Sequence, residues 1–138
     1  MLSSFRNAQK RYQNTRVNTA SQKELLIMLL QGGIKFLRMA EESIQEEQFE
    51  KANNYLIRAQ EVVNELRVSL DMERGGEFAE RMDVLYDFMY RRLVQANTKK
   101  DAETVVQVRE MFQELLDTWE QALQNGSTEA SSGINQRA

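Results

Sequence analysis

The stretch FEKANNYLIRAQEVVNELRVSL, residues 49–70, decides the fold of this chain. Its apolar residues recur at alternating steps of three and four, which is the spacing of one face of an α-helix and not of a strand. The row consists of Phe49, Ala52, Leu56, Ala59, Val63, Leu66 and Leu70. Such a row is typical of helices that pack lengthwise against one another. The stretch therefore predicts an amphipathic helix within a helical bundle.

Three other stretches repeat this spacing. The first is expected to form a helix over about 22–46 and opens with Ser21-Gln22-Lys23-Glu24, which reads as a capping box. Its apolar row is Leu25, Leu29, Gly33, Phe36, Ala40 and Ile44. The row of the third helix is Phe78, Met82, Leu85, Met89, Leu93 and Ala96. The row of the fourth helix, which ends near Gln124, is Val105, Val108, Phe112, Leu115, Trp119 and Ala122. Trp119 is accordingly expected to be buried.

The links between these helices are short. Gly75-Gly76 is the strongest break, and Asp101 is positioned to cap the fourth helix. Since short links force successive helices to run antiparallel, the sequence predicts an all-α, up-down-up-down four-helix bundle. The bundle is expected over 21–124, between a basic N-terminal arm at 1–20 and a small, polar, disordered tail at 125–138. Gly32-Gly33, inside the first helix, implies a close contact with a helix or a ligand there.

Composition excludes several classes of function. The 138 residues contain no cysteine, histidine or proline. The usual general base, the usual zinc ligands and any cysteine nucleophile are therefore missing, and we expect no enzyme, no metal and no cofactor. The net charge of −3 disfavours nucleic acid as a partner. Without a long apolar run or a signal-peptide core, we expect a cytoplasmic protein that does not insert into membranes.

Charge divides the chain into two parts. Residues 1–23 carry +5 with no acidic residue, whereas residues 24–124 carry −8. The arm also has a small apolar face at Leu2, Phe5 and Tyr12. One interpretation is that the arm folds back to cap an apolar surface of the acidic body. The other is a solvated, irregular terminus.

More apolar residues are present than one row per helix can place in a core. A wide apolar face that meets two neighbouring helices explains part of this surplus. The remainder is expected to form an exposed groove that binds a partner helix. The candidate groove residues are Leu30, Ile34, Leu37, Tyr55, Val62, Tyr86, Phe88, Tyr90 and Leu116.

Several motifs resemble the flagellin export chaperone family. They are VNTAS at 17–21, LLIMLLQGGIKFL at 25–37, KANNYLIRAQEVVNEL at 51–66, LYDFMYRRLVQANTKKDAE at 85–103 and LLDTWEQAL at 115–123. Together with Tyr12, they cover about residues 12–123 in order. One departure is Leu29-Leu30-Gln31-Gly32, where the family commonly has Leu-Tyr-Asp-Gly, which puts contacts specific to that Tyr-Asp pair in doubt.

The resemblance implies a FliS-like chaperone that binds the disordered C-terminal segment of flagellin. Such a chaperone prevents premature polymerisation and delivers its client to the flagellar type III export apparatus. The groove residues would then bind the client. Leu2, Phe5 and Tyr12 would cap the groove or dock at an export gate component. A homodimer is possible when no client is bound. The alternatives are a bundle that only mediates interaction or dimerisation, and an enzyme that uses carboxylates or a metal.

Overall fold

The computed structural model describes residues 19–137, with side chains described over residues 21–125. Within that range the chain forms four α-helices and no strand. The helices are α2 (Thr19–Gln45), α3 (Phe49–Val68), α4 (Met72–Lys99) and α5 (Ala102–Arg137). The predictions made for Leu2, Phe5 and Tyr12 lie outside the described residues.

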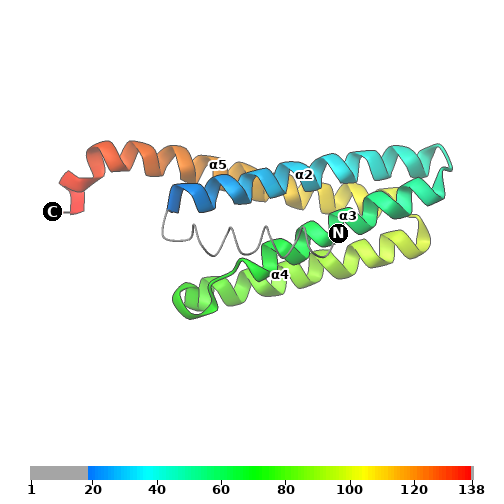
Figure 1. Ribbon diagram of the computed structural model, residues 1–138, viewed down its shortest axis with the longest axis horizontal. Coiled ribbons are helices and arrows are strands. Elements are labelled where there is room, and N and C mark those ends of the chain that lie inside the picture. Colours follow the sequence, from blue (N-terminus) through cyan, green and yellow to red (C-terminus); the bar gives the residue numbers. More distant parts are fainter. Residues whose placement is uncertain (1–18, 138) are drawn as a thin grey trace.

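The helices lie side by side along the long axis of the molecule, and each runs antiparallel to the one before it (Figure 1). Contacts pass around the bundle, because α2 packs against both α3 and α5, α3 packs against α4, and α4 packs against α5. The α4–α5 contact is the least extensive of the four. The predicted all-α, up-down-up-down four-helix bundle is confirmed.

The predicted row of α2 is buried at Gly33, Ala40 and Ile44, but it departs from the structure at other positions. Leu30 and Leu37 are fully buried, whereas Leu29 and Phe36 are only partly buried against the core. Since α2 packs against two helices, it buries a wide face. At these positions the most buried residue is the one that follows the residue predicted from spacing. In α4, likewise, Tyr86 is buried where Leu85 was expected to be.

Gly33 allows α2 and α5 to approach closely. A Cβ atom added to Gly33 would overlap the ring of Phe112 in α5, whose Cδ2 atom would lie 2.7 Å away. Gly32, by contrast, has nothing within 4 Å of its added Cβ position. The close contact expected at the glycine pair therefore exists, and it is a helix–helix contact at Gly33.

The helix ends follow local sequence with two corrections. Asp101 caps α5 as predicted: its carboxylate accepts hydrogen bonds from the Thr104 hydroxyl at 2.7 Å and the Glu103 N–H at 3.1 Å. The Thr104 bond is the main reason that the pKa of Asp101 lies below its usual range. The predicted capping box is wrong, because Ser21 already lies inside α2.

The second correction concerns the end of α5. The helix continues to Arg137, so the predicted end near Gln124 is wrong. An isolated glycine such as Gly126 costs a helix about 1 kcal/mol but, unlike proline, still donates its backbone hydrogen bond. Beyond Asn125 the helix runs past the end of the bundle (Figure 1). That residues 125–138 are disordered in solution stays a prediction.

Ion pairs fix some neighbouring helices more firmly than others. Arg67 of α3 binds Asp83 at 2.5 Å and Asp87 at 3.0 Å, both in α4. Arg109 of α5 pairs with Glu41 of α2. Across α4 and α5, an exposed hydrogen bond joins Arg92 to Gln107 at 2.7 Å. The α4–α5 side therefore combines the least extensive helix contact with an exposed hydrogen bond.

Candidate binding cleft

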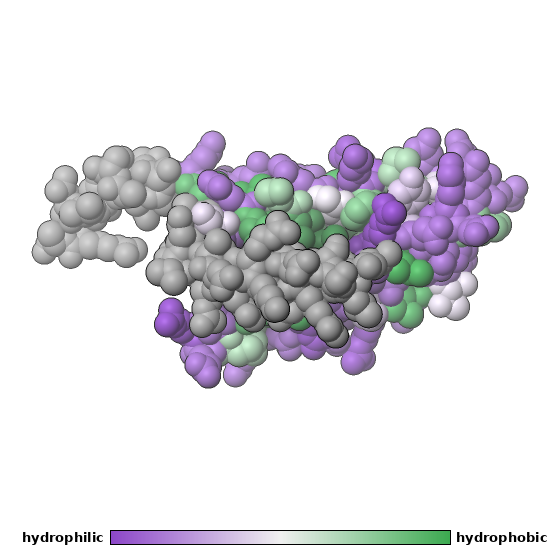
Figure 2. All heavy atoms as spheres, viewed as in Figure 1, coloured by the Kyte–Doolittle hydropathy of each residue, from purple (hydrophilic) through white to green (hydrophobic). Residues whose placement is uncertain are grey.

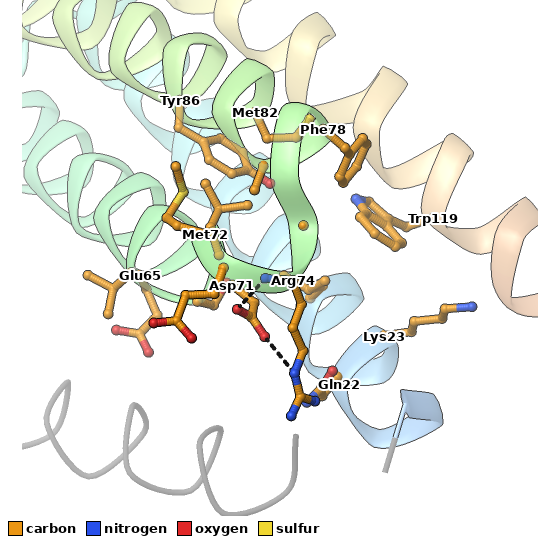
Figure 3. A pocket seen from close by; sticks show the side chains of 17 residues that line it. Gln22, Lys23, Glu65, Asp71, Met72, Arg74, Phe78, Met82, Tyr86 and Trp119 are labelled. Atoms are coloured by element: carbon orange, nitrogen blue, oxygen red, sulfur yellow. Dashed lines mark hydrogen bonds and ion pairs between the residues drawn. The ribbon is translucent and has the colours of Figure 1, made fainter. Parts of the chain in front are cut away.

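A cleft of about 780 Å³ opens at the end of the bundle where α2 begins (Figure 3). All four helices contribute to its lining. The lining includes Lys23 from α2, Glu65 and Val68 from α3, the N-cap Asp71 with Met72, Glu73, Arg74 and Phe78 from the first turns of α4, and Trp119 from α5. Apolar and charged side chains therefore face the same space, as is usual for binding sites.

The cleft is bounded by a kink inside α4. Gly76 has φ +53° and ψ −130°, a conformation that is essentially restricted to glycine. Before the kink, one turn is held by Asp71, whose carboxylate accepts a hydrogen bond from the Arg74 N–H at 3.1 Å. The predicted break at Gly75-Gly76 therefore exists as a kink at Gly76 within α4, and the link from α3 runs from Ser69 to Asp71.

Two aromatic side chains form one wall of the cleft. Phe78 is 56% exposed, and Trp119 is partly buried against the edge of the core. Figure 3 shows the two rings beside each other, one from α4 and one from α5. The prediction that Trp119 is buried is wrong, because α5 meets the kinked start of α4 here and not a continuous helix face.

Val68 and Met72 extend this apolar surface. Both side chains line the cleft, and they are 51% and 48% exposed. Large apolar side chains that gather around one hollow, and are not scattered singly, usually mark a site where a partner binds. The cleft is therefore the best candidate for a functional surface on the described part of the chain.

Glu65 is the buried acid of the cleft. Its exposed fraction is only 7%, and burial raises the pKa of its carboxyl group above the usual range. Within the described residues, the carboxylate has neither an ion-pair nor a hydrogen-bond partner. The nearby acid Asp71 differs, because it pairs with Arg74 at 3.8 Å and is exposed.

The seam between α4 and α5 includes Phe78, which also lines the cleft. Phe78 and Leu85 lie fourteen and seven residues before Arg92, respectively, so by helical phase they share the side of α4 that bonds to α5. Met111 and Leu115, one and two helical turns beyond Gln107, occupy the corresponding side of α5. Leu85, Met111 and Leu115 are all partly buried against the core.

Most of the nine predicted groove residues are buried and not exposed. Six of them are buried in the core cluster: Leu30, Ile34, Leu37, Val62, Tyr86 and Leu116. Their predicted exposure is wrong. Each helix buries the wide face that two neighbours require, and this uses most of the surplus that one row could not place. Of the six, Tyr86 lines the cleft from within the core.

The other three lie at or near the surface. Phe88 is 50% exposed, while Tyr55 and Tyr90 are partly buried against the core. None of these three lines the cleft. In Figure 2, hydrophobic residues are visible along the middle of the face shown, with hydrophilic residues at its margins. A role of Phe88, Tyr55 and Tyr90 in binding a partner stays a prediction.

Sequence reasoning missed the main parts of the cleft. Phe78 and Trp119 had been assigned to the core rows, and Glu65 drew no attention among the many acidic residues. One signal could have found Phe78: it comes two residues after Gly75-Gly76, where a helix face is interrupted. Nothing in the sequence distinguishes Glu65 from its exposed neighbours.

Other kinds of site find little support. Among the described residues, no group of three or more acidic side chains lies close enough together to hold a metal ion. None of the helices in that part of the chain combines the length and apolar character that a membrane span requires.

The fold and the cleft place this chain among helical-bundle proteins that present an apolar surface to a partner. A comparison of the sequence with protein families identifies which kind. Residues 5–126 match the family described as flagellar protein FliS, and the chain belongs to that family.

Several characterised relatives share most of their length with this chain. The flagellar secretion chaperone FliS of Bacillus subtilis is 40% identical over 121 residues, covering 88% of this chain and 90% of its own. The flagellar secretion chaperone FliS of Escherichia coli is 34% identical over 78% of this chain and 79% of its own. That of Salmonella typhimurium is 32% identical over 83% and 86%. These relatives support an export chaperone role.

Proposed function

We propose that this chain is a cytoplasmic export chaperone for flagellin. It binds the disordered C-terminal segment of flagellin, prevents premature polymerisation, and delivers the client to the flagellar type III export apparatus. The relatives, which are flagellar secretion chaperones, support the role, and one observation carries the mode of action: a cleft at the end of the bundle that is lined by exposed apolar side chains.

Binding by such a surface is coupled to folding of the client. A disordered segment loses conformational entropy when it becomes ordered, and burial of apolar area has to exceed that loss. Phe78, Val68 and Met72 are each about half exposed, so they have apolar area left to bury. An amphipathic helix of the client that lies in the cleft, with its apolar face on these side chains, provides the required burial.

The basic arm regulates access to this surface in the proposal. Residues 1–23 carry +5 against the acidic body, and Leu2 and Phe5 supply apolar contacts. When no client is bound, the arm covers the client site and lowers the tendency of the protein to aggregate. Tyr12, in the same arm, is the proposed contact for the export gate.

The experiment is calorimetric titration of a C-terminal flagellin peptide into the full chain and into two variants. Phe78→Ala removes an exposed ring from the cleft. Val84→Ala removes a side chain that is 69% exposed and does not line the cleft, so it controls for the loss of any exposed apolar group on α4. If Phe78 is a binding hot spot, its loss weakens affinity about 30-fold, whereas Val84→Ala changes it less than about twofold.

The outcomes separate the proposal from its rival. A wild-type chain that does not bind the peptide would contradict the flagellin client. If the chain instead forms a concentration-dependent dimer that Phe78→Ala disrupts, the cleft serves self-association, as a simple dimerisation module would require. Sedimentation with and without the peptide distinguishes these two cases.

A further inference from the structure

We propose that Glu65 determines the specificity of the cleft by selecting a client segment that places a Lys or Arg side chain inside it. The inference rests on the proposed function, because the occupant is the client segment. It adds the chemistry by which the cleft recognises its occupant: an apolar helix face that carries one cation.

The burial of Glu65 is the first observation. Only 7% of the surface of Glu65 as a whole residue is exposed, and proteins usually compensate for such burial of an acid by pairing its charge. This bundle does so elsewhere. Arg67, two residues further along α3, is held by two aspartates, and the partly buried Glu41 pairs with Arg109. Glu65 has no such partner within the described part of the chain.

The surroundings of Glu65 are the second observation. Three acidic and two basic side chains line the cleft: Glu65, Asp71 and Glu73 against Lys23 and Arg74. Asp71 already engages Arg74, through both its backbone N–H and its guanidinium group. The cleft therefore retains an excess of negative charge that an incoming cation can neutralise.

The apolar walls favour a long basic side chain over a small polar one. Lys and Arg bury their aliphatic stems along apolar surface while the charged end reaches a polar partner. Val68, one turn beyond Glu65 on α3, and Met72, which Figure 3 shows on the same side of the cleft as Glu65, supply such a surface, and Phe78 and Trp119 lie on the opposite side. A cation compensates for the lost hydration of Glu65 better than a neutral hydrogen-bond donor does. The reason is that hydrogen bonds between charged groups are about twice as strong as neutral ones.

The experiment compares Glu65→Gln with Glu80→Gln in the full chain. Both changes remove one negative charge, but Glu65 is buried and lines the cleft, whereas Glu80 of α4 is exposed and does not line it. Titration of the flagellin C-terminal peptide should give about 10-fold or greater loss of affinity for Glu65→Gln. For Glu80→Gln, water screens the charge, and the change should be less than about twofold.

Thermal unfolding without the peptide tests for a purely structural role. Glu65→Gln should raise the melting temperature of the free protein, because it removes a buried and unpaired charge. A structural role predicts the reverse, namely a lower melting temperature together with weaker binding. Higher stability combined with weaker binding is therefore the signature of a residue kept for recognition.

Peptide variants identify the partner of Glu65. Each Lys or Arg of the peptide is replaced by Ala in turn and titrated into both the wild type and Glu65→Gln, which forms double-mutant cycles. One replacement should lose its effect in the Glu65→Gln background. The proposal is overturned if Glu65→Gln binds the peptide as tightly as the wild type, because a neutral hydrogen-bond donor on the peptide would give that result. It is also overturned if no Lys or Arg replacement couples to Glu65. A wild type that fails to bind the peptide would refute the flagellin client instead, so the two failures are distinguishable.

Discussion

Substitution of the two adjacent glycines in α2 should have opposite effects on stability. Gly33 faces Phe112 of α5, whereas Gly32 has open space beside it. Both positions lie inside a helix, where replacement of glycine by alanine contributes about 1 kcal/mol of stability when nothing obstructs the new methyl group. The pair therefore separates helix propensity from packing in one experiment.

The expected magnitude for Gly33→Ala follows from the packing of Phe112. The added Cβ atom would lie 2.7 Å from Cδ2 of that ring, whereas ordinary van der Waals contact begins at 3.4 Å. Phe112 is fully buried and cannot turn out into water. Overpacking of this kind costs about 3 kcal/mol, and the gain in propensity offsets about 1 kcal/mol, which leaves a net loss of about 2 kcal/mol.

The assay is thermal or chemical unfolding followed by far-ultraviolet circular dichroism. At about 4 °C per kcal/mol for a domain of this size, Gly33→Ala should lower the melting temperature by about 8 °C, and Gly32→Ala should raise it by about 4 °C. Phe112→Leu should lessen the penalty of Gly33→Ala in the double variant, because the smaller side chain leaves room for the methyl group. A neutral or stabilising Gly33→Ala would refute the close approach of α2 and α5.

Three further predictions concern the remaining parts of the chain. Deletion of residues 126–138 should shift the melting temperature by no more than about 2 °C in a thermal scan, because this part of α5 runs beyond the bundle. A larger loss would mean that it packs on the body. Deletion of residues 2–15 should tighten flagellin peptide binding about 10- to 100-fold if the arm closes over the cleft 90–99% of the time, with part of the gain lost at high salt in calorimetric titrations. Weaker binding would mean that the arm holds the client. Finally, the raised pKa of Glu65 means that the folded state binds this proton more tightly than the unfolded state, so stability falls as pH rises from about 4.5 through the raised pKa. Denaturant unfolding across this window should show that Glu65→Gln lacks this slope, and equal slopes in the two proteins would contradict the assignment.

Local sequence determined the number and the direction of the helices. The spacing of Leu56, Val63 and Leu66 is that of a helix face. Because the links are short, each helix has to run antiparallel to the one before it. Asp101 could be identified as a cap from its position alone, because a cap depends on hydrogen bonds within a few residues. The close approach at Gly33 was also foreseeable, since a glycine inside a helix needs a packing reason.

Tertiary structure alone decided which apolar residues are buried and which are left for a partner. Leu29 and Leu30 are both apolar and differ by about 100° around α2, so only the positions of α3 and α5 determine which of them faces the core. The same dependence placed Trp119 at a cleft, beside Phe78 of α4. Glu65 became a candidate site only through burial, which depends on neighbours from other helices that its own stretch of sequence does not contain.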